Sequence, residues 1–223
     1  MSHFLLHVET ATKVCSVALS LNGRQVAIKE TNSDQYIHGE SLNLFIEEVL
    51  CDAKIEIQDL NAVSISSGPG SYTGLRIGVS SVKGLCYGLG IPLISIPTLD
   101  ALYFLAREKY TSESICVMLD ARRMEVYSQI WGNDGAILKS LSADVLDENT
   151  YNEFDSFVCV GDGAEKMRDI WNPRSIHFDS SLIPSAAGQI KLAYNKFLVN
   201  DFVDVADFVP HYLKEFQSTG QSK

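Results

Sequence analysis

The sequence predicts an α/β fold of two similar halves, each with three antiparallel strands followed by alternating helices and strands. The first observation is strand-like alternation over residues 3–9, 13–21 and 24–31, with an Asn22-Gly23 hairpin signal between the last two. The second is that helical patterns then alternate with short apolar runs, as in parallel strand–helix–strand units. The third is that this order recurs after residue 110. We therefore expect a duplicated βββαβαβα arrangement with mixed sheets.

The first half enters its helical part at residues 38–54. There Leu42, Phe45, Ile46 and Val49 recur at helical spacing, which predicts an amphipathic helix. The other elements expected in this half are a strand at 62–67, a helix at 73–89, a strand at 92–96 and a helix at 98–109.

The second half repeats the order with shorter elements. We expect strands at 114–120, 125–131, 136–145 and 157–160, a short helix at 147–154, a helix from Ala164, a strand at 175–178 and a long helix at 185–199. The domain prediction is two subdomains, 1–109 and 110–223, the second including a polar C-terminal tail.

Composition indicates which partners and which cellular location to expect for this protein. Eighteen basic and 28 acidic side chains give a formal charge of −10, which repels phosphate backbones, and Arg122-Arg123 is the one basic cluster. The five cysteines are dispersed without a CxxC motif, which is typical of reduced thiols in the cytoplasm. No apolar run reaches about 18 residues, and no basic segment precedes the short N-terminal apolar run. We expect a cytoplasmic protein without a membrane span or a signal peptide.

A glycine-rich turn separates the expected strand 62–67 from the expected helix 73–89. It reads Gly68-Pro69-Gly70-Ser71-Tyr72-Thr73. Glycine permits positive φ and close backbone approach, and a serine or threonine here can cap the helix. The free N–H groups of such a helix start can hold a phosphate or carboxylate, but the sequence matches neither a Walker A loop nor GxGxxG. An anion site and a merely tight turn both remain open.

The helix that follows contains four glycines, Gly74, Gly78, Gly84 and Gly88. Each costs about 1 kcal/mol relative to alanine in a helix. They pair one turn apart, as 74/78 and 84/88, so that each pair forms a flat patch that another backbone can approach. The neighbour is either the protein's own sheet or a helix of a second chain. Two patches at different angles suggest that both surfaces are used.

The segment GPGSYTGLRIGVSSVKGLCYGLGIPLISIPTLDAL, residues 68–102, resembles the signature of the bacterial TsaB (YeaZ) family within the TsaD-like superfamily. VETATKVCSVAL, HGESLNLFIEEVL, LDARRMEVYSQIW, VGDGAEK and PHYL resemble other landmarks of that family, so the likeness covers most of the chain. It implies an actin-like (ASKHA) fold. It also implies a role in making threonylcarbamoyladenosine (t6A) on tRNA.

The resemblance implies a partner rather than a catalyst. The family pairs with the catalytic TsaD through its first two long helices, and the ATPase TsaE joins the pair. tRNA would be bound only through the complex, and a homodimer through the same helices is possible when TsaD is absent. The interface residues carried over are His38, Leu42, Phe45, Ile46, Val49, Gly74, Arg76, Gly78 and Ser81.

We expect no catalytic residue and no metal site in this chain. TsaD carries a metal-binding HxxxH where this chain reads Thr98-Leu99-Asp100-Ala101-Leu102, without histidine. The only HxxxH here is His3 and His7, which lie about 13 Å apart along a strand and so cannot share a metal.

The nucleotide site of actin-like ATPases is altered in this sequence. The first hairpin reads Glu9-Thr10-Ala11-Thr12, without the Asp and Gly that hold magnesium and phosphate. Vestigial nucleotide contacts are therefore assigned to Glu9, Thr10, Asp120, Gly161 and Gly163. We expect no cofactor of the chain's own, with ATP or ADP possible at the interface of the complex. The alternative function is a stand-alone metallopeptidase or an actin-fold small-molecule kinase.

Overall fold

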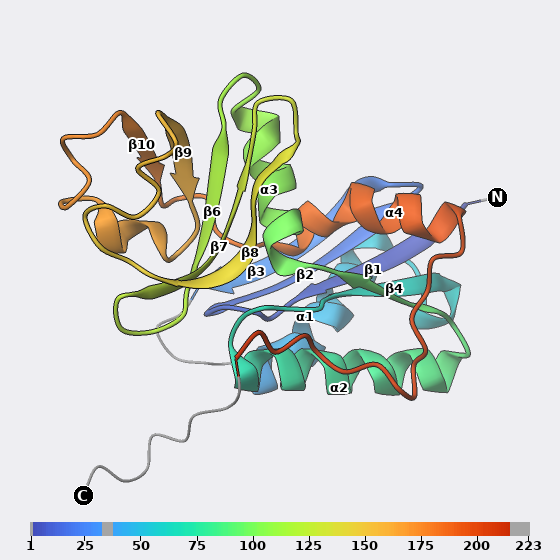
Figure 1. The fold of residues 1–223 in the computed structure, drawn as a ribbon. Helices are drawn as coiled ribbons and strands as arrows, with labels where there is room; N and C mark the ends of the chain where they lie inside the picture. The colour runs from blue at the N-terminus through green and yellow to red at the C-terminus, as the bar shows by residue number, and fades with distance from the viewer. Residues whose placement is uncertain (1, 33–37, 215–223) are drawn as a thin grey trace, which may run out of the picture.

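The computed structural model describes residues 2–32 and 38–214 (Figure 1). These residues form two five-stranded sheets with the same internal plan. The first has the strand order β3-β2-β1-β4-β5 and the second has the order β10-β9-β6-β7-β8. In each sheet the first three strands in sequence are antiparallel, and the next two run parallel to the first of them. The predicted duplication is confirmed.

The first half follows the predicted elements closely. Its elements are β1 (Phe4–Glu9), β2 (Val14–Leu21), β3 (Arg24–Asn32), α1 (His38–Ala53), η1 (Ile57–Asp59), β4 (Leu60–Ser66), α2 (Tyr72–Leu89), β5 (Leu93–Ile96) and α3 (Thr98–Lys109). Asn22 and Gly23 both have positive φ at the turn between β2 and β3, as the hairpin signal requires.

The second half keeps its strands but loses most of its helices. Its elements are β6 (Ile115–Asp120), β7 (Glu125–Trp131), β8 (Ile137–Val145), β9 (Phe157–Val160), η2 (Ala164–Met167), β10 (Ile176–Asp179), η3 (Ala186–Gln189) and α4 (Ile190–Leu198). The helix predicted from Ala164 is a single 3₁₀ turn. The long helix predicted at 185–199 is divided between η3 and α4.

The helix predicted at 147–154 is wrong, because this segment consists of turns. The side chain of Asp147 accepts hydrogen bonds from the backbone N–H of Asn149 (2.9 Å) and from the Thr150 hydroxyl (2.8 Å). Tyr151 has a φ of 62°, outside the helical region. Local side-chain bonds of this kind compete with helix formation, and here they prevail.

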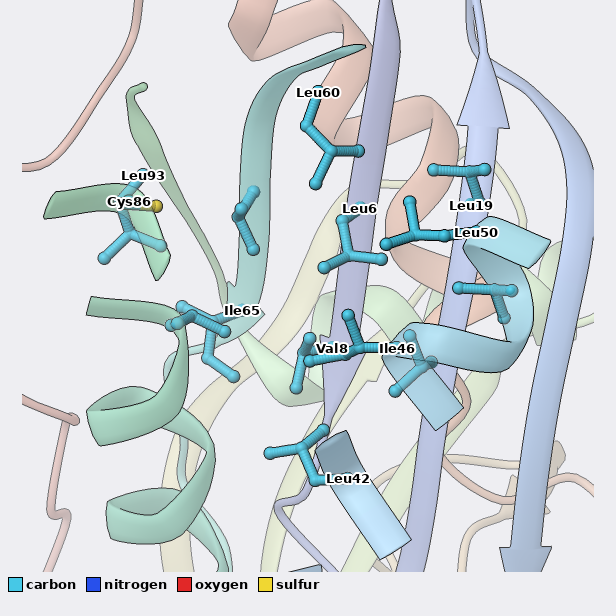
Figure 2. Packing of buried hydrophobic residues seen from close by; sticks show 14 of the residues in the cluster. Leu6, Val8, Leu19, Leu42, Ile46, Leu50, Leu60, Ile65, Cys86 and Leu93 are labelled. Carbon is cyan, nitrogen blue, oxygen red and sulfur yellow. The ribbon is translucent and has the colours of Figure 1, made fainter. Parts of the chain in front are cut away.

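The main hydrophobic core lies between the first sheet and the helices α1 and α2, which cover one of its faces (Figure 1). Figure 2 shows Leu42, Ile46 and Leu50 of α1 pointing toward the strand residues Leu6 and Val8. Burial of this apolar surface is the main force holding the two helices in place.

The end of the chain returns to the first half. α4 lies on the opposite face of the first sheet from α1 and α2 (Figure 1), where Ala193 packs with Leu5 and Ile94. Val203 then forms a bridge with Leu93. The change from the first sheet to the second falls between β5 and β6, and residues 186–214 pack largely on the first sheet. The division into subdomains 1–109 and 110–223 stays a prediction.

Candidate partner-binding face

Helix α2 begins at the glycine-rich turn, which the rest of the chain packs closely. The backbone N–H of Ser71 donates to Ala11 O (2.6 Å), and the Ser71 hydroxyl caps the helix by accepting from Gly74 N (3.3 Å). A methyl group on Gly70 would overlap the Ala11 carbonyl. Gly68, with a φ of 102°, lies so close to His211 that a Cβ would come within 2.5 Å of its carbonyl oxygen. Close packing therefore accounts for both glycines of this turn.

The remaining residues of the predicted signature loop line the same turn. Pro69 is buried, Tyr72 is half-buried and Thr73 is exposed. Tyr72 contacts the ring of Tyr212 at 4.9 Å between centroids, so the turn and the C-terminal part of the chain form one unit.

The inner face of α2 includes two of its four glycines. Gly74 and Gly78 are buried. A methyl group on Gly78 would overlap the Thr10 hydroxyl and lie 3.1 Å from Cδ1 of Ile65. Gly78 therefore lets α2 approach its own first hairpin, which corrects its predicted role in an outer patch. Gly74 is buried as well, so it is not part of an exposed patch.

The outer face of α2 is exposed and nearly free of bulky side chains. We define this outer face by Thr73, Arg76, Ser80, Gly84, Tyr87 and Gly88, all of which are exposed. In the described part of the chain, no atom other than those of the adjacent residues and backbone of α2 lies within 4 Å of where a Cβ of Gly84 or Gly88 would be. Tyr87 is 86% exposed and is the most exposed large apolar residue described. An aromatic side chain beside a flat, small-residue surface is a typical contact of a protein partner.

Helix α1 supplies less to this face than predicted. Leu42, Ile46 and Val49 belong to the protein's own core, which corrects their predicted place in a partner seam. The reason is that the apolar stripe of α1 packs against the first sheet. Phe45 is half-buried at the edge of that core, whereas Leu44, which was not predicted, is 51% exposed.

Of the other predicted interface residues, only Arg76 belongs to the outer face. His38 is the first residue of α1, but its side chain lies outside the described part of the structure. Ser81 is half-buried. The guanidinium of Arg76 stacks over the Tyr72 ring (4.0 Å from Cζ to the centroid), and its Nε donates to the hydroxyl of Tyr212 (3.3 Å).

The C-terminal strap, residues 203–214, covers one flank of α2 (Figure 1). Lys83 Nζ donates to the carbonyl oxygens of Ala206 (2.8 Å) and Phe208 (2.9 Å). The N–H of His211 donates to Ser67 O (2.7 Å), and Phe208 packs against the main core. The sequence did not predict these contacts, although the PHYL resemblance marked the segment. The strap leaves the outer face of α2 uncovered.

The first hairpin contains a buried polar network. Glu9 is fully buried, and its two carboxylate oxygens accept from the N–H of Ala11 (2.6 Å) and from the hydroxyl of Ser66. Gln189 donates to Ser66 Oγ (3.0 Å) and to Val8 O (2.7 Å), which joins the hairpin to η3. Burial raises the pKa of Glu9 to about 7, against hydrogen bonds that lower it.

The same network continues to His7 through Ser64. The Ser64 hydroxyl donates to Gln189 Oε1 (2.7 Å) and contacts His7 Nδ1 (2.7 Å), and His7 Nε2 contacts Ser20 (2.8 Å). Burial lowers the pKa of His7 to about 3, so the ring is neutral. The interpretation of His7 as a strand residue is confirmed.

The residues predicted as nucleotide contacts in the second half also make contacts within the protein. Asp120 forms an ion pair with Lys166 (2.7 Å) and accepts from the N–H of Arg122 (2.6 Å). A Cβ on Gly161 would overlap the Met118 carbonyl, and one on Gly163 would lie 2.9 Å from Val126. These glycines therefore hold the β9–η2 turn against β6.

These residues do not fit a magnesium–phosphate group. Both carboxylate oxygens of Glu9 already accept hydrogen bonds, and the charge of Asp120 is already balanced by the ion pair with Lys166. The Thr10 hydroxyl points at Gly78 of α2 rather than outward. Within residues 2–32 and 38–214, no group of three or more His, Cys, Asp or Glu side chains is placed to hold a metal ion. No helix in those residues is long and apolar enough to cross a membrane.

The duplicated sheets and their covering helices define an α/β protein of the actin-like class. A family model described as TsaD, tRNA N6-adenosine threonylcarbamoyltransferase, matches residues 32–200. The chain belongs to this family.

Individual relatives point to one branch of it. The chain is 29% identical to the Haemophilus influenzae tRNA threonylcarbamoyladenosine biosynthesis protein TsaB, over 94% of this chain and 93% of the relative. It is 28% identical to the Escherichia coli protein of the same name, over 94% of each. Among solved structures, YeaZ from Pseudomonas aeruginosa superposes with a TM-score of 0.79 at 25% identity, covering 95% of this chain and all of that one. These likenesses confirm the predicted resemblance to TsaB and support a role in t6A biosynthesis.

Proposed function

We propose that this chain is a non-catalytic subunit of the bacterial complex that makes t6A on tRNA, where it binds and activates TsaD, with TsaE as a third component. The relatives named TsaB support the pathway. The single observation that supports a subunit role is the outer face of α2, a surface with small residues and one exposed aromatic ring. Such a surface suits a helix of a partner, because two backbones can approach closely over glycine and serine.

The chemistry is assigned to TsaD. At the place where TsaD carries its metal-binding histidines, this chain has Thr98, Leu99, Ala101 and Leu102 buried in packing positions of α3. Nucleotide is assigned to the complex rather than to this chain's first hairpin, since both oxygens of Glu9 already accept hydrogen bonds. tRNA is likewise bound by the assembled complex.

The direct test is reconstitution from purified components. We expect the chain alone to transfer no threonylcarbamoyl group to tRNA, and TsaD with TsaE to become active when the chain is added. Transfer by the chain alone, or full activity of TsaD and TsaE without it, would refute the proposal.

A variant pair tests the face itself. Gly84→Leu places a bulky side chain in open space, so the fold should survive while co-elution with TsaD is lost. Lys191→Leu is the control, because Lys191 is an exposed residue of α4 on the opposite face of the sheet. If Gly84→Leu co-elutes with TsaD as well as the control does, the outer face is not the docking site.

A further inference from the structure

The tip of the hairpin between β6 and β7 is built from two consecutive arginines in an unfavourable backbone conformation. Arg122 has a φ of 68° and Arg123 a φ of 45°. Positive φ costs an ordinary side chain about 1 kcal/mol or more, which is why glycine and asparagine usually occupy such positions. The turn between β2 and β3 has the same requirement and meets it with Asn22 and Gly23.

Both arginines are exposed, and neither side chain has a hydrogen bond or ion pair within residues 2–32 and 38–214. Hydrogen bonds nevertheless fix the backbone of this hairpin. Arg122 O accepts from the N–H of Glu125 (3.2 Å), and Lys166 Nζ donates to the carbonyl oxygens of Arg123 and Glu125 (2.7 Å each). The surrounding contacts therefore fix a strained turn whose two charged side chains point to solvent.

Two of the neighbouring carboxylates already pair with other cations, and a third accepts a backbone hydrogen bond. Asp120 pairs with Lys166 (2.7 Å), and Glu125 pairs with Lys214 (2.5 Å). Asp162 uses one carboxylate oxygen to accept from the backbone N–H of Asp120 (3.0 Å). The two arginines are thus left as uncompensated positive charges in a chain whose net charge is −10. Because two adjacent cations stand together at this tip, an anionic partner meets less repulsion here than the net charge of the chain implies.

We propose that Arg122 and Arg123 contact the phosphate backbone of the tRNA when the chain is part of the modifying complex. An arginine fork matches phosphate geometry, and backbone contacts need no pocket. A nucleoside triphosphate fits less well, since small ligands need a concave site. Two cavities, of about 420 and 380 Å³, include no residue of the tip in their lining. They are lined by residues 112–114, 133, 156–158, 175 and 177 and by residues 14, 30–32, 105 and 181–185. This inference rests on the proposed function for the identity of the RNA.

The structure provides a variant that separates binding from folding. Arg122→Asn with Arg123→Gly removes both charges and relieves the strained φ angles, so the thermal midpoint Tm should hold or rise by about 2–4 °C. The control is Arg24→Asn with Lys54→Gly, two exposed cations without a described ion pair, of which Lys54 also has a positive φ of 57°. Both double variants lose two positive charges, so only the position of the charge differs.

The measurement is tRNA affinity by fluorescence anisotropy over a range of salt concentrations, for the chain assembled with TsaD and TsaE and for the chain alone at low salt. The tip variant should weaken tRNA binding about tenfold and reduce the slope of log affinity against log salt by about 2, while the control changes neither. Equal behaviour of the two variants would overturn the inference. So would a loss of ATP binding without a loss of tRNA binding.

The outcomes distinguish this inference from the proposed function. If the chain does not assemble with TsaD, the proposed function fails, and the inference about the arginines, which concerns the assembled complex, fails with it. If the chain assembles and activates TsaD but the tip variant binds tRNA like the control, only the inference about the arginines fails.

Discussion

Alanine substitutions at two glycines of α2, Gly84 and Gly78, should have opposite effects on stability. Alanine is favoured over glycine in a helix by about 1 kcal/mol. At Gly84 nothing lies within 4 Å of the new methyl group, so the full gain should appear, raising Tm by about 2–4 °C. At Gly78 the methyl group would overlap the Thr10 hydroxyl and press on Ile65, both of which are fully buried. Overpacking of this kind costs about 1–3 kcal/mol, which leaves a net loss of about 1 kcal/mol.

Urea unfolding followed by far-ultraviolet circular dichroism measures both variants against the parent chain. The m-value should stay constant, so that the difference in midpoint converts directly to free energy. If Gly78→Ala proves as stable as Gly84→Ala, α2 does not press on the first hairpin, and the division into an inner and an outer face is wrong. A loss of stability for Gly84→Ala would show that the outer face is covered in the free protein.

Two further predictions concern the parts that hold α2 and the first hairpin. Burial raises the pKa of Glu9 from 4.5 to about 7, so the folded state binds the proton more tightly than the unfolded chain does. The free energy of unfolding should therefore fall by roughly 3 kcal/mol as the pH rises from 4.5 to about 7. Glu9→Gln should remove this loss, so its stability relative to the parent should be greater at about pH 8 than at about pH 5; an unchanged difference would contradict the assignment. Lys83→Ala should cost about 1–3 kcal/mol and increase amide exchange in residues 203–212, since it removes two charge-assisted hydrogen bonds to the strap. Lys191→Ala, which loses a surface ion pair with Glu108 and a contact with the Phe104 ring, should cost at most about 1 kcal/mol. Equal exchange in both variants would show that Lys83 does not hold the strap.

The local sequence pattern was sufficient to predict the elements of the first half of the fold. Alternation, the Asn22-Gly23 turn and the helical spacing of Leu42, Ile46 and Val49 each correspond to an observed element within a few residues. These signals are strong because each element buries one regular apolar face. The second half was less predictable, since its connections are turns stabilised by side-chain bonds such as those of Asp147, which periodicity does not reveal.

The candidate site was predicted only in part. The sequence identified α2 as the important helix and its glycines as the unusual feature. It could not tell what each glycine meets, because a glycine carries no side chain that would indicate its neighbour. Tyr87 could have been found, since it lies off the face formed by Leu75, Val79 and Val82 on a helical wheel. The strap could not, because its contacts with Lys83 and Ser67 join residues more than 100 positions apart.

The sequence by itself determined the duplicated strand order, the altered hairpin at Glu9 and the likeness to TsaB, because each of these is written in local spacing and residue type. Only the tertiary structure decided which glycines of α2 meet the protein's own first hairpin and which remain open. It also decided that Glu9 is enclosed in a polar network and that Arg122 and Arg123 have no carboxylate partner among residues 2–32 and 38–214. The physical reason is that burial and charge pairing depend on segments brought together from distant parts of the chain, which no local pattern records.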